Sequence, residues 1–234
     1  DVDHLIVYPR TYELTELGIP SLSHVGDTKS EARVFDDPSR LTGVREYIAG
    51  DSLRRIHWKA SARNRALQVK LFEYTTDLKV AVFLAVDTFA GLSADDLELG
   101  ISTAASVARH LLERNVQTGL FVNTKSADTG DPARVSAGAG AVQLALVLEA
   151  LAKTTTASDG SFAQFFDRQR GELGFGGTLI FVVGEVSPEI RLLMADLTHT
   201  GRRLLGFHVG PDGLESGISS GMRWRHVHQL AVAG

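Results

Sequence analysis

Short apolar runs alternate with helix signals through most of this sequence. The strands expected at 79–86 and 178–183 are apolar throughout except for their first residues, and further strands are expected at 116–122 and 203–209. A strand without polar alternation is typical of a parallel sheet, whose strands are buried on both faces. Parallel strands need crossover connections, which are usually helical and right-handed. The alternation therefore predicts an α/β fold, with a mostly parallel, doubly wound sheet between two helical layers.

Two helix starts can be located from the residue types alone. Ser93, with Asp96 three residues later, forms a capping box, in which a hydroxyl and a carboxylate satisfy the free amides of a helix start. Ser187, Pro188 and Glu189 supply a hydroxyl cap, a proline at the first helical position and an acid near the positive end of the helix dipole. We therefore expect helices to begin directly after Ser93 and at Pro188.

The first third of the sequence follows a different pattern. It contains short extended stretches, with strands expected at 5–9, 43–49 and 66–75. In the last of these, apolar and polar residues alternate, as they do in a strand that is buried on one face only. The change of pattern predicts a small β-rich module over residues 1–78 and an α/β domain over residues 79–234.

Composition excludes several classes of site. The 234 residues contain no cysteine, which removes disulfides, iron–sulfur clusters and thiolate zinc sites. The formal net charge of −4 argues against a basic surface over the whole chain. No apolar run approaches the ~18 residues that a membrane helix needs. Because the chain does not begin with Met, we expect it to be part of a longer protein.

Residues 52–72 form a strongly basic stretch. They contain six lysine and arginine side chains and no acidic one, so the rest of the chain carries a formal charge of −10. Such a stretch can bind nucleic acid, or it can pair with acids of the α/β domain and fasten the module to it. We expect the second. Within the stretch, we expect Trp58 to be a buried anchor and His57 a packed imidazole.

The same region contains an ordered motif. A tyrosine is followed by Gly-Asp, by an arginine, by Ile-His-Trp-Lys and by Ala-Arg, all within residues 43–73. This run, here called the signature segment, resembles the hallmark of the domain of unknown function 58 family. We expect its main residues to fix the segment and to join the two parts of the chain; they are Arg45, Tyr47, Gly50, Asp51, Arg54, Trp58, Lys59 and Arg63.

The resemblance carries implications that the residues alone do not. It implies a von Willebrand factor A-like α/β half and a bacterial or archaeal parent protein that begins with two membrane helices. The parent would lie in the cell membrane, with this part in the cytoplasm. Genes of the family often lie beside a gene for a MoxR-type AAA+ ATPase, which implies an assembly or chaperone-like partnership with that enzyme.

The resemblance also raises the question of a metal site. Von Willebrand A domains commonly bind Mg²⁺ through an Asp-x-Ser-x-Ser run after the first strand, together with a later Thr and Asp. The equivalent run begins here with Asp87 and Thr88, but its two hydroxyl positions hold Phe89 and Gly91. Glu185 takes the place of the second acid. We therefore expect a degenerate site without bound metal, bordered by Asp87, Thr88 and Glu185.

The leading prediction for function is a non-enzymatic protein-interaction scaffold. We find no nucleophile elbow, Walker motif or paired-carboxylate motif in the sequence, so we expect no catalytic residue and no cofactor. Two alternatives stay open. One is a ligand-binding domain that depends on a divalent metal such as Mg²⁺. The other is nucleic-acid binding through the basic stretch 54–70, which the acidic net charge makes a weaker expectation.

Overall fold

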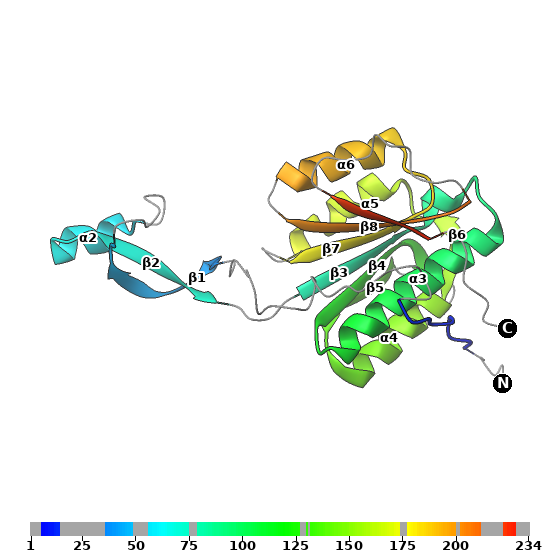
Figure 1. Cartoon of the computed structure of the whole chain (residues 1–234), viewed down its shortest axis with the longest axis horizontal. Helices are drawn as coiled ribbons and strands as arrows, with labels where there is room; N and C mark the ends of the chain where they lie inside the picture. The colour runs from blue at the N-terminus through cyan, green and yellow to red at the C-terminus, as the bar shows by residue number, and fades with distance from the viewer. Residues whose placement is uncertain are drawn as a thin grey trace. The chain divides into compact units, whose positions relative to one another are not determined.

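Figure 1 shows the computed structural model of the chain, which divides into two compact units. The small unit comprises residues 29–76, and the α/β unit comprises residues 1–28 together with 77–234. The structure describes residues 6–14, 36–48, 56–74, 79–126, 130, 132–173, 177–199, 202–211 and 222–227.

A seven-stranded sheet forms the centre of the α/β unit. Its strand order is β5-β4-β3-β7-β8-β9, with β6 also paired to β4. The central strands are parallel, whereas β5 and β6 run antiparallel to β4. Because the chain builds outward from β3 first on one side and then on the other, the sheet is doubly wound, as predicted. The strands are β3 (Lys79–Ala85), β4 (Gln117–Ser126), β5 (Pro132–Gly138), β6 (Thr154–Ser158), β7 (Thr178–Val183), β8 (Arg203–Val209) and β9 (Arg223–Val227).

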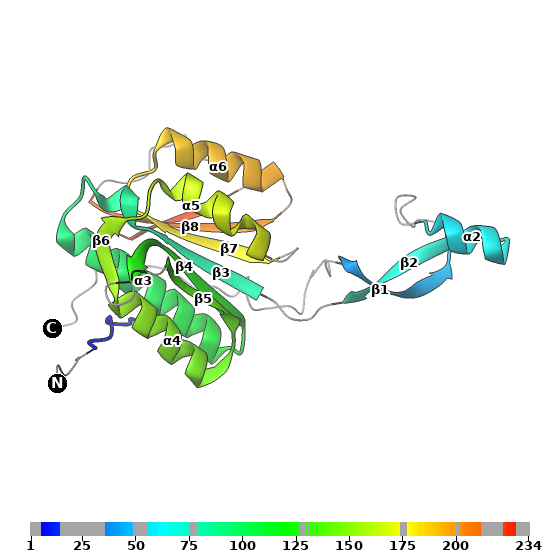
Figure 2. The same ribbon diagram turned by 180° about the vertical axis from the view of Figure 1, so that it is seen from behind.

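Helices cover both faces of this sheet, which confirms the predicted α/β class (Figures 1 and 2). On one face, Val82 and Leu84 of β3 belong to a core that includes residues of α3 (Ala94–Glu113) and α4 (Gly140–Ala152). On the other face, Phe83 packs among aromatic side chains from β4, β7 and α5 (Phe162–Gln169), in a core completed by α6 (Pro188–His199). None of the helices in the described ranges is long and apolar enough to cross a membrane.

Both helix starts lie where the sequence places them. The Ser93 hydroxyl accepts a hydrogen bond from the Asp96 amide at 3.2 Å, and the Asp96 carboxylate accepts one from the Ser93 amide at 3.0 Å. This completes the predicted capping box at the start of α3. Helix α6 begins at Pro188, and the Ser187 hydroxyl accepts from the Ile190 amide at 3.3 Å.

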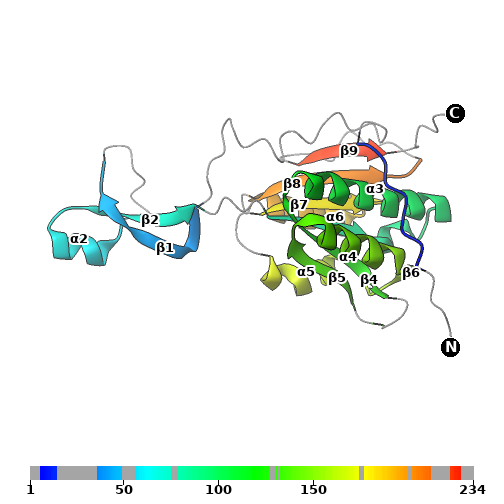
Figure 3. The same ribbon diagram turned by 90° about the horizontal axis from the view of Figure 1, so that it is seen from below.

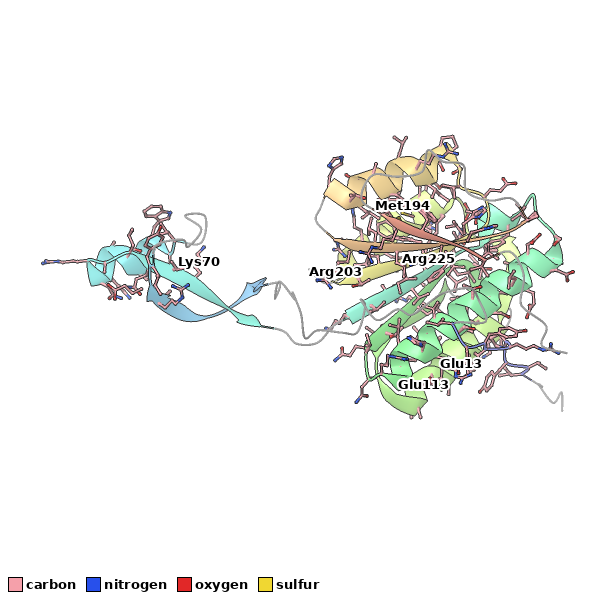
Figure 4. All side chains as sticks on the ribbon, viewed as in Figure 1. Glu13, Lys70, Glu113, Met194, Arg203 and Arg225 are labelled. Carbon is pink, nitrogen blue, oxygen red and sulfur yellow. The ribbon has the colours of Figure 1, made fainter. Side chains whose placement is uncertain are left out.

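The N-terminal segment 6–14 differs from its prediction. No part of it is a strand, and it packs on α3 of the α/β unit (Figure 3), although it was expected in the β-rich module. The Tyr12 amide donates to Ser106 Oγ at 2.9 Å, and Leu14 is buried in the core on this face. Arg109 of α3 forms ion pairs with Glu13 and Glu113, whose side chains lie close together in Figure 4. Burial of Leu14 explains why the segment belongs with the α/β unit.

The small unit contains an antiparallel pair of strands and one short helix. Strand β1 (Asp36–Glu46) pairs with β2 (Gln68–Tyr74), and Glu46 lies opposite Gln68 in the register. Ile56 forms an isolated bridge to Val69 on β2. Ile56 and Val69 are the buried apolar residues in the described part of this unit. Helix α2 (Trp58–Asn64) connects the bridge to β2.

Candidate functional site

Asp87 lies at the carboxyl edge of the sheet, where open α/β sheets usually bind ligands. Asn123 Nδ2 of β4 donates to Asp87 Oδ1 at 2.7 Å, and the Phe162 amide donates to Asp87 Oδ2 at 2.8 Å. Phe162 is the first residue of α5, so the carboxylate lies at the positive end of that helix. Asn123 Oδ1 in turn accepts from the Val86 amide. Both oxygens of Asp87 therefore tie β3 to β4 and α5.

Thr88 makes a second connection across the same edge. Its hydroxyl donates to the Ala85 carbonyl at 2.6 Å and accepts from the Gly184 amide at 2.7 Å. The Glu185 amide donates to the Thr88 carbonyl at 2.8 Å. A Cβ on Gly184 would lie only 2.6 Å from that carbonyl oxygen, so the close approach requires glycine. Thr88 is therefore a buried residue with a structural role, since its hydrogen bonds join the ends of β3 and β7.

Side chains of the protein itself fill the space beside these strand ends. Phe89 is buried, and Leu92 follows it in the connection to α3. Leu92 Cδ1 lies 2.8 Å from the position that a Cβ on Gly184 would take, and 3.5 Å from the equivalent position on Gly210. Leu92 therefore covers the ends of β7 and β8. Its side chain occupies part of the space in which the crevice is predicted.

The donor set at this edge does not fit a hexacoordinate cation. Magnesium needs about six oxygen ligands in near-octahedral geometry. Phe89 and Gly91 supply no side-chain donor, and the oxygens of Asp87 already accept bonds from the protein. Glu185 is exposed, with Oε1 3.0 Å from where a Cβ on Gly91 would lie. Within the described ranges, no group of three or more acidic or histidine side chains is placed to hold a metal.

The signature segment begins α2 through a histidine cap. His57 Nδ1 accepts from the Ala60 amide at 3.1 Å, and the His57 amide donates to the Gln68 carbonyl at 2.7 Å. Ser61 Oγ donates to the His57 carbonyl at 3.1 Å and accepts from the Gln68 amide at 2.8 Å. These bonds fasten the first turns of α2 to β2. His57 is a half-buried cap, whereas the sequence predicted a packed imidazole.

Trp58 corrects a second prediction. Its side chain was expected to be a buried anchor, but 68% of the residue is exposed. Trp58 is the first residue of a seven-residue helix in which no residue is buried. The buried apolar residues in the described part of the small unit, Ile56 and Val69, lie outside this helix. Lys59 and Arg63 of the same helix are exposed as well. The exposed side chains of Trp58, Lys59 and Arg63 therefore all belong to the short helix α2.

The other signature residues support the strands or lie outside the described ranges. The Tyr47 amide donates to the Leu67 carbonyl at 2.8 Å and extends the β1–β2 ladder. Arg45 Nη1 donates to the Glu46 carbonyl at 3.0 Å. Whether the signature joins the two parts of the chain stays a prediction. Three of its residues lie outside the described ranges: Gly50, Asp51 and Arg54.

Comparison with protein families matches residues 43–170 to the family described as "Protein of unknown function DUF58". The matched residues are more than half of the chain. The chain belongs to the DUF58 family. This confirms the family that the signature segment suggested. The match starts within β1 and includes the whole hydrogen-bond network of Asp87, whereas Glu185 lies beyond it. A comparison with curated proteins finds no match.

Sequence reasoning missed the partners of Asp87 in this DUF58 chain. Asn123 is a fully buried amide at the end of the apolar run 119–122 within β4. A polar residue in such a run is a signal that a specific hydrogen bond is needed there. The second partner is the backbone amide of Phe162, which no residue type reveals. Only the fold brings this amide to the end of β3.

Proposed function

We propose that this DUF58 chain is a non-enzymatic protein-interaction scaffold, and that Trp58 is the centre of its contact surface. The observation that carries the proposal is the 68% exposure of this tryptophan on a helix that is fixed to a sheet. Large exposed aromatic side chains are costly to leave in water. At interfaces, tryptophan is strongly enriched among the residues that dominate binding energy.

The way in which Trp58 is presented supports this role. The cap by His57 and the bond between Ser61 and Gln68 hold the first turns of α2 in place before any partner binds. Preorganisation of this kind reduces the entropy that is lost on association. Lys59 and Arg63, exposed on the same helix, favour a partner with an acidic rim around an apolar pocket.

The carboxyl edge of the sheet supports a scaffold in a different way. Asp87 and Thr88 use their side-chain oxygens to join strands and a helix, and Leu92 covers the adjacent strand ends. An acid that is held in two structural hydrogen bonds is a poor general base or nucleophile. We therefore propose that the carboxyl edge of the sheet stabilises the α/β unit and that the small unit binds the partner.

The family resemblance supplies the partner and the location in this proposal. We propose a MoxR-type AAA+ ATPase as the partner, and a parent protein that is anchored in the cell membrane with this part in the cytoplasm. The test is isothermal titration of the 234-residue chain with a MoxR-type ATPase encoded beside its gene. Trp58→Ala should weaken binding by roughly tenfold or more, because the indole would occupy the centre of the interface.

Leu192→Ala is the matched control for this titration. Leu192 is 73% exposed on α6 and is equally apolar, so its loss should leave the affinity unchanged. Binding that is the same for wild type and Trp58→Ala would remove the proposed surface. Nucleic-acid binding that falls steeply with salt, and is lost in Lys59→Gln with Arg63→Gln, would replace the proposal with the nucleic-acid alternative.

A further inference from the structure

Two arginines lie at the amino edge of the sheet, opposite the edge that holds Asp87. Arg170 begins the short helix η3 (Arg170–Glu172) directly after α5, and Arg202 directly precedes β8. Figure 4 labels Arg203, the next residue, at this edge. Gln169 is the last residue of α5 and is buried. We call Gln169, Arg170 and Arg202 the guanidinium corner.

The two arginines differ in how their charges are balanced. Arg170 donates to the Asp196 carboxylate, and its Nη1 lies 3.8 Å from Asp167 Oδ1. Arg202 Nη2 donates to the Leu173 carbonyl at 3.3 Å, but its Nη1 is buried and meets no hydrogen-bond partner in the part of the chain that the structure describes. Burial lowers the pKa of Arg202, and repulsion by Arg170 lowers it further.

Gln169 adds a second unsatisfied atom to the same corner. Its residue is 8% exposed, and its Oε1 is buried without a hydrogen-bond partner among the described residues. A half-turn of the amide exchanges this oxygen for the Nε2 donor. Buried polar atoms are almost always paired, so the Nη1 of Arg202, unpaired within the described ranges, indicates a missing acceptor. Arg202 reaches the α5 end of the unit through the carbonyl of Leu173, four residues after Gln169.

The charges of the guanidinium corner favour a ligand with one negative charge. The negative charges of Asp167 and Asp196 both lie against Arg170, so within the guanidinium corner Arg202 offers one positive charge to a bound anion. A doubly charged anion would therefore leave more uncompensated charge than a singly charged one. The planar fork of a guanidinium matches the two oxygens of a carboxylate.

We propose that the guanidinium corner is a carboxylate-binding site, in which Arg202 Nη1 and the turned Gln169 amide donate to the bound oxygens. The carboxylate belongs either to a small free acid or to an acidic side chain of a protein partner, since the chemistry at Arg202 is the same. The guanidinium corner belongs to the α/β unit and Trp58 to the small unit, and the proposed site does not depend on the function proposed for Trp58.

The test is thermal unfolding of the full chain in sodium acetate and in sodium chloride at equal ionic strength. Wild type should melt about 3 °C higher in saturating acetate. Arg202→Met should lose this response and should melt higher than wild type in chloride, because the buried Nη1 donor that has no partner among the described residues is gone. Arg168→Met is the matched control: Arg168 is exposed and paired with Asp159, so this variant should keep the acetate response.

Two results would overturn the site. One is an acetate response in Arg202→Met equal to that of wild type. The other is a lower melting temperature of Arg202→Met in chloride, which would make the guanidinium a structural group. If Arg202→Met does not fold, Arg202→Lys replaces it; loss of the response supports the site, and full retention contradicts it. Titration with a blocked glutamyl peptide distinguishes a small free acid from an acidic side chain of a partner. A site for a partner's side chain should raise the melting temperature with the peptide as well as with acetate, whereas a site for a small acid should respond to acetate alone.

Discussion

At the scale of single residues, His57 determines where α2 begins. Its Nδ1 is the side-chain acceptor for the Ala60 amide at the helix start. His57→Ala should lower the free energy of unfolding of the small unit by about 1 kcal/mol, the usual effect of losing an N-cap. Hydrogen exchange of the α2 amides measures this directly, because faster exchange reports the loss of the cap.

The control for this prediction keeps the acceptor and changes the ring. Asp is among the best N-cap residues, so His57→Asp should retain most of the protection that His57→Ala loses. Equal exchange in wild type and His57→Ala would show that the bond between Ser61 and Gln68 holds α2 without the cap.

At the scale of elements, Asp87 connects β3, β4 and α5 through one carboxylate. Asp87→Ala removes both acceptors and leaves the Asn123 amide group and the Phe162 backbone amide unsatisfied. Loss of a charged hydrogen-bonding group should cost about 3 kcal/mol in the free energy of unfolding. Urea denaturation measures the change. Glu185→Ala, an exposed acid at the same edge, should change it by less than about 0.5 kcal/mol.

Asp87→Ala also tests whether this edge of the sheet binds Mg²⁺. Because the donor set does not fit Mg²⁺, the midpoint of urea unfolding should be the same with and without millimolar Mg²⁺. A midpoint that rises with Mg²⁺ in wild type, and not in Asp87→Ala, would show that the carboxylate binds the ion in spite of its structural hydrogen bonds.

The sequence predicts the helices and strands better than the contacts between them. Capping residues and apolar runs act locally, so the starts of α3 and α6 and the buried strands can be predicted from them. The position of Asp87 after β3 follows in the same way. Its bond to Asn123 joins residues 36 positions apart and depends on the strand order, which local patterns do not contain. The burial predicted for Trp58 was wrong for a related reason, because burial depends on the tertiary packing of the small unit, which the residue type does not show.

At the scale of the whole molecule, His110 makes stability depend on pH. Burial lowers the pKa of His110, Arg114 lowers it further, and Glu113 and Glu13 partly oppose these effects. Arg114 Nη1 lies 2.8 Å from His110 Nδ1 and can only donate, so Nδ1 must be the acceptor of a neutral ring. The folded chain therefore binds fewer protons than the unfolded chain between the lowered pKa and the ordinary value of about 6.5.

The difference in bound protons determines whether His110 makes the chain more or less stable as the pH rises. Where the unfolded state binds more protons, the free energy of unfolding increases with pH. The contribution of His110 is complete above about pH 6.5 and is lost as the pH falls through the lowered pKa. In urea unfolding from pH 5 to 8, the stability of wild type relative to His110→Gln should therefore rise with pH. Since His110 is only partly buried, we expect a small slope, and a difference that is constant or falls with pH would show that protonation of this ring is not linked to folding.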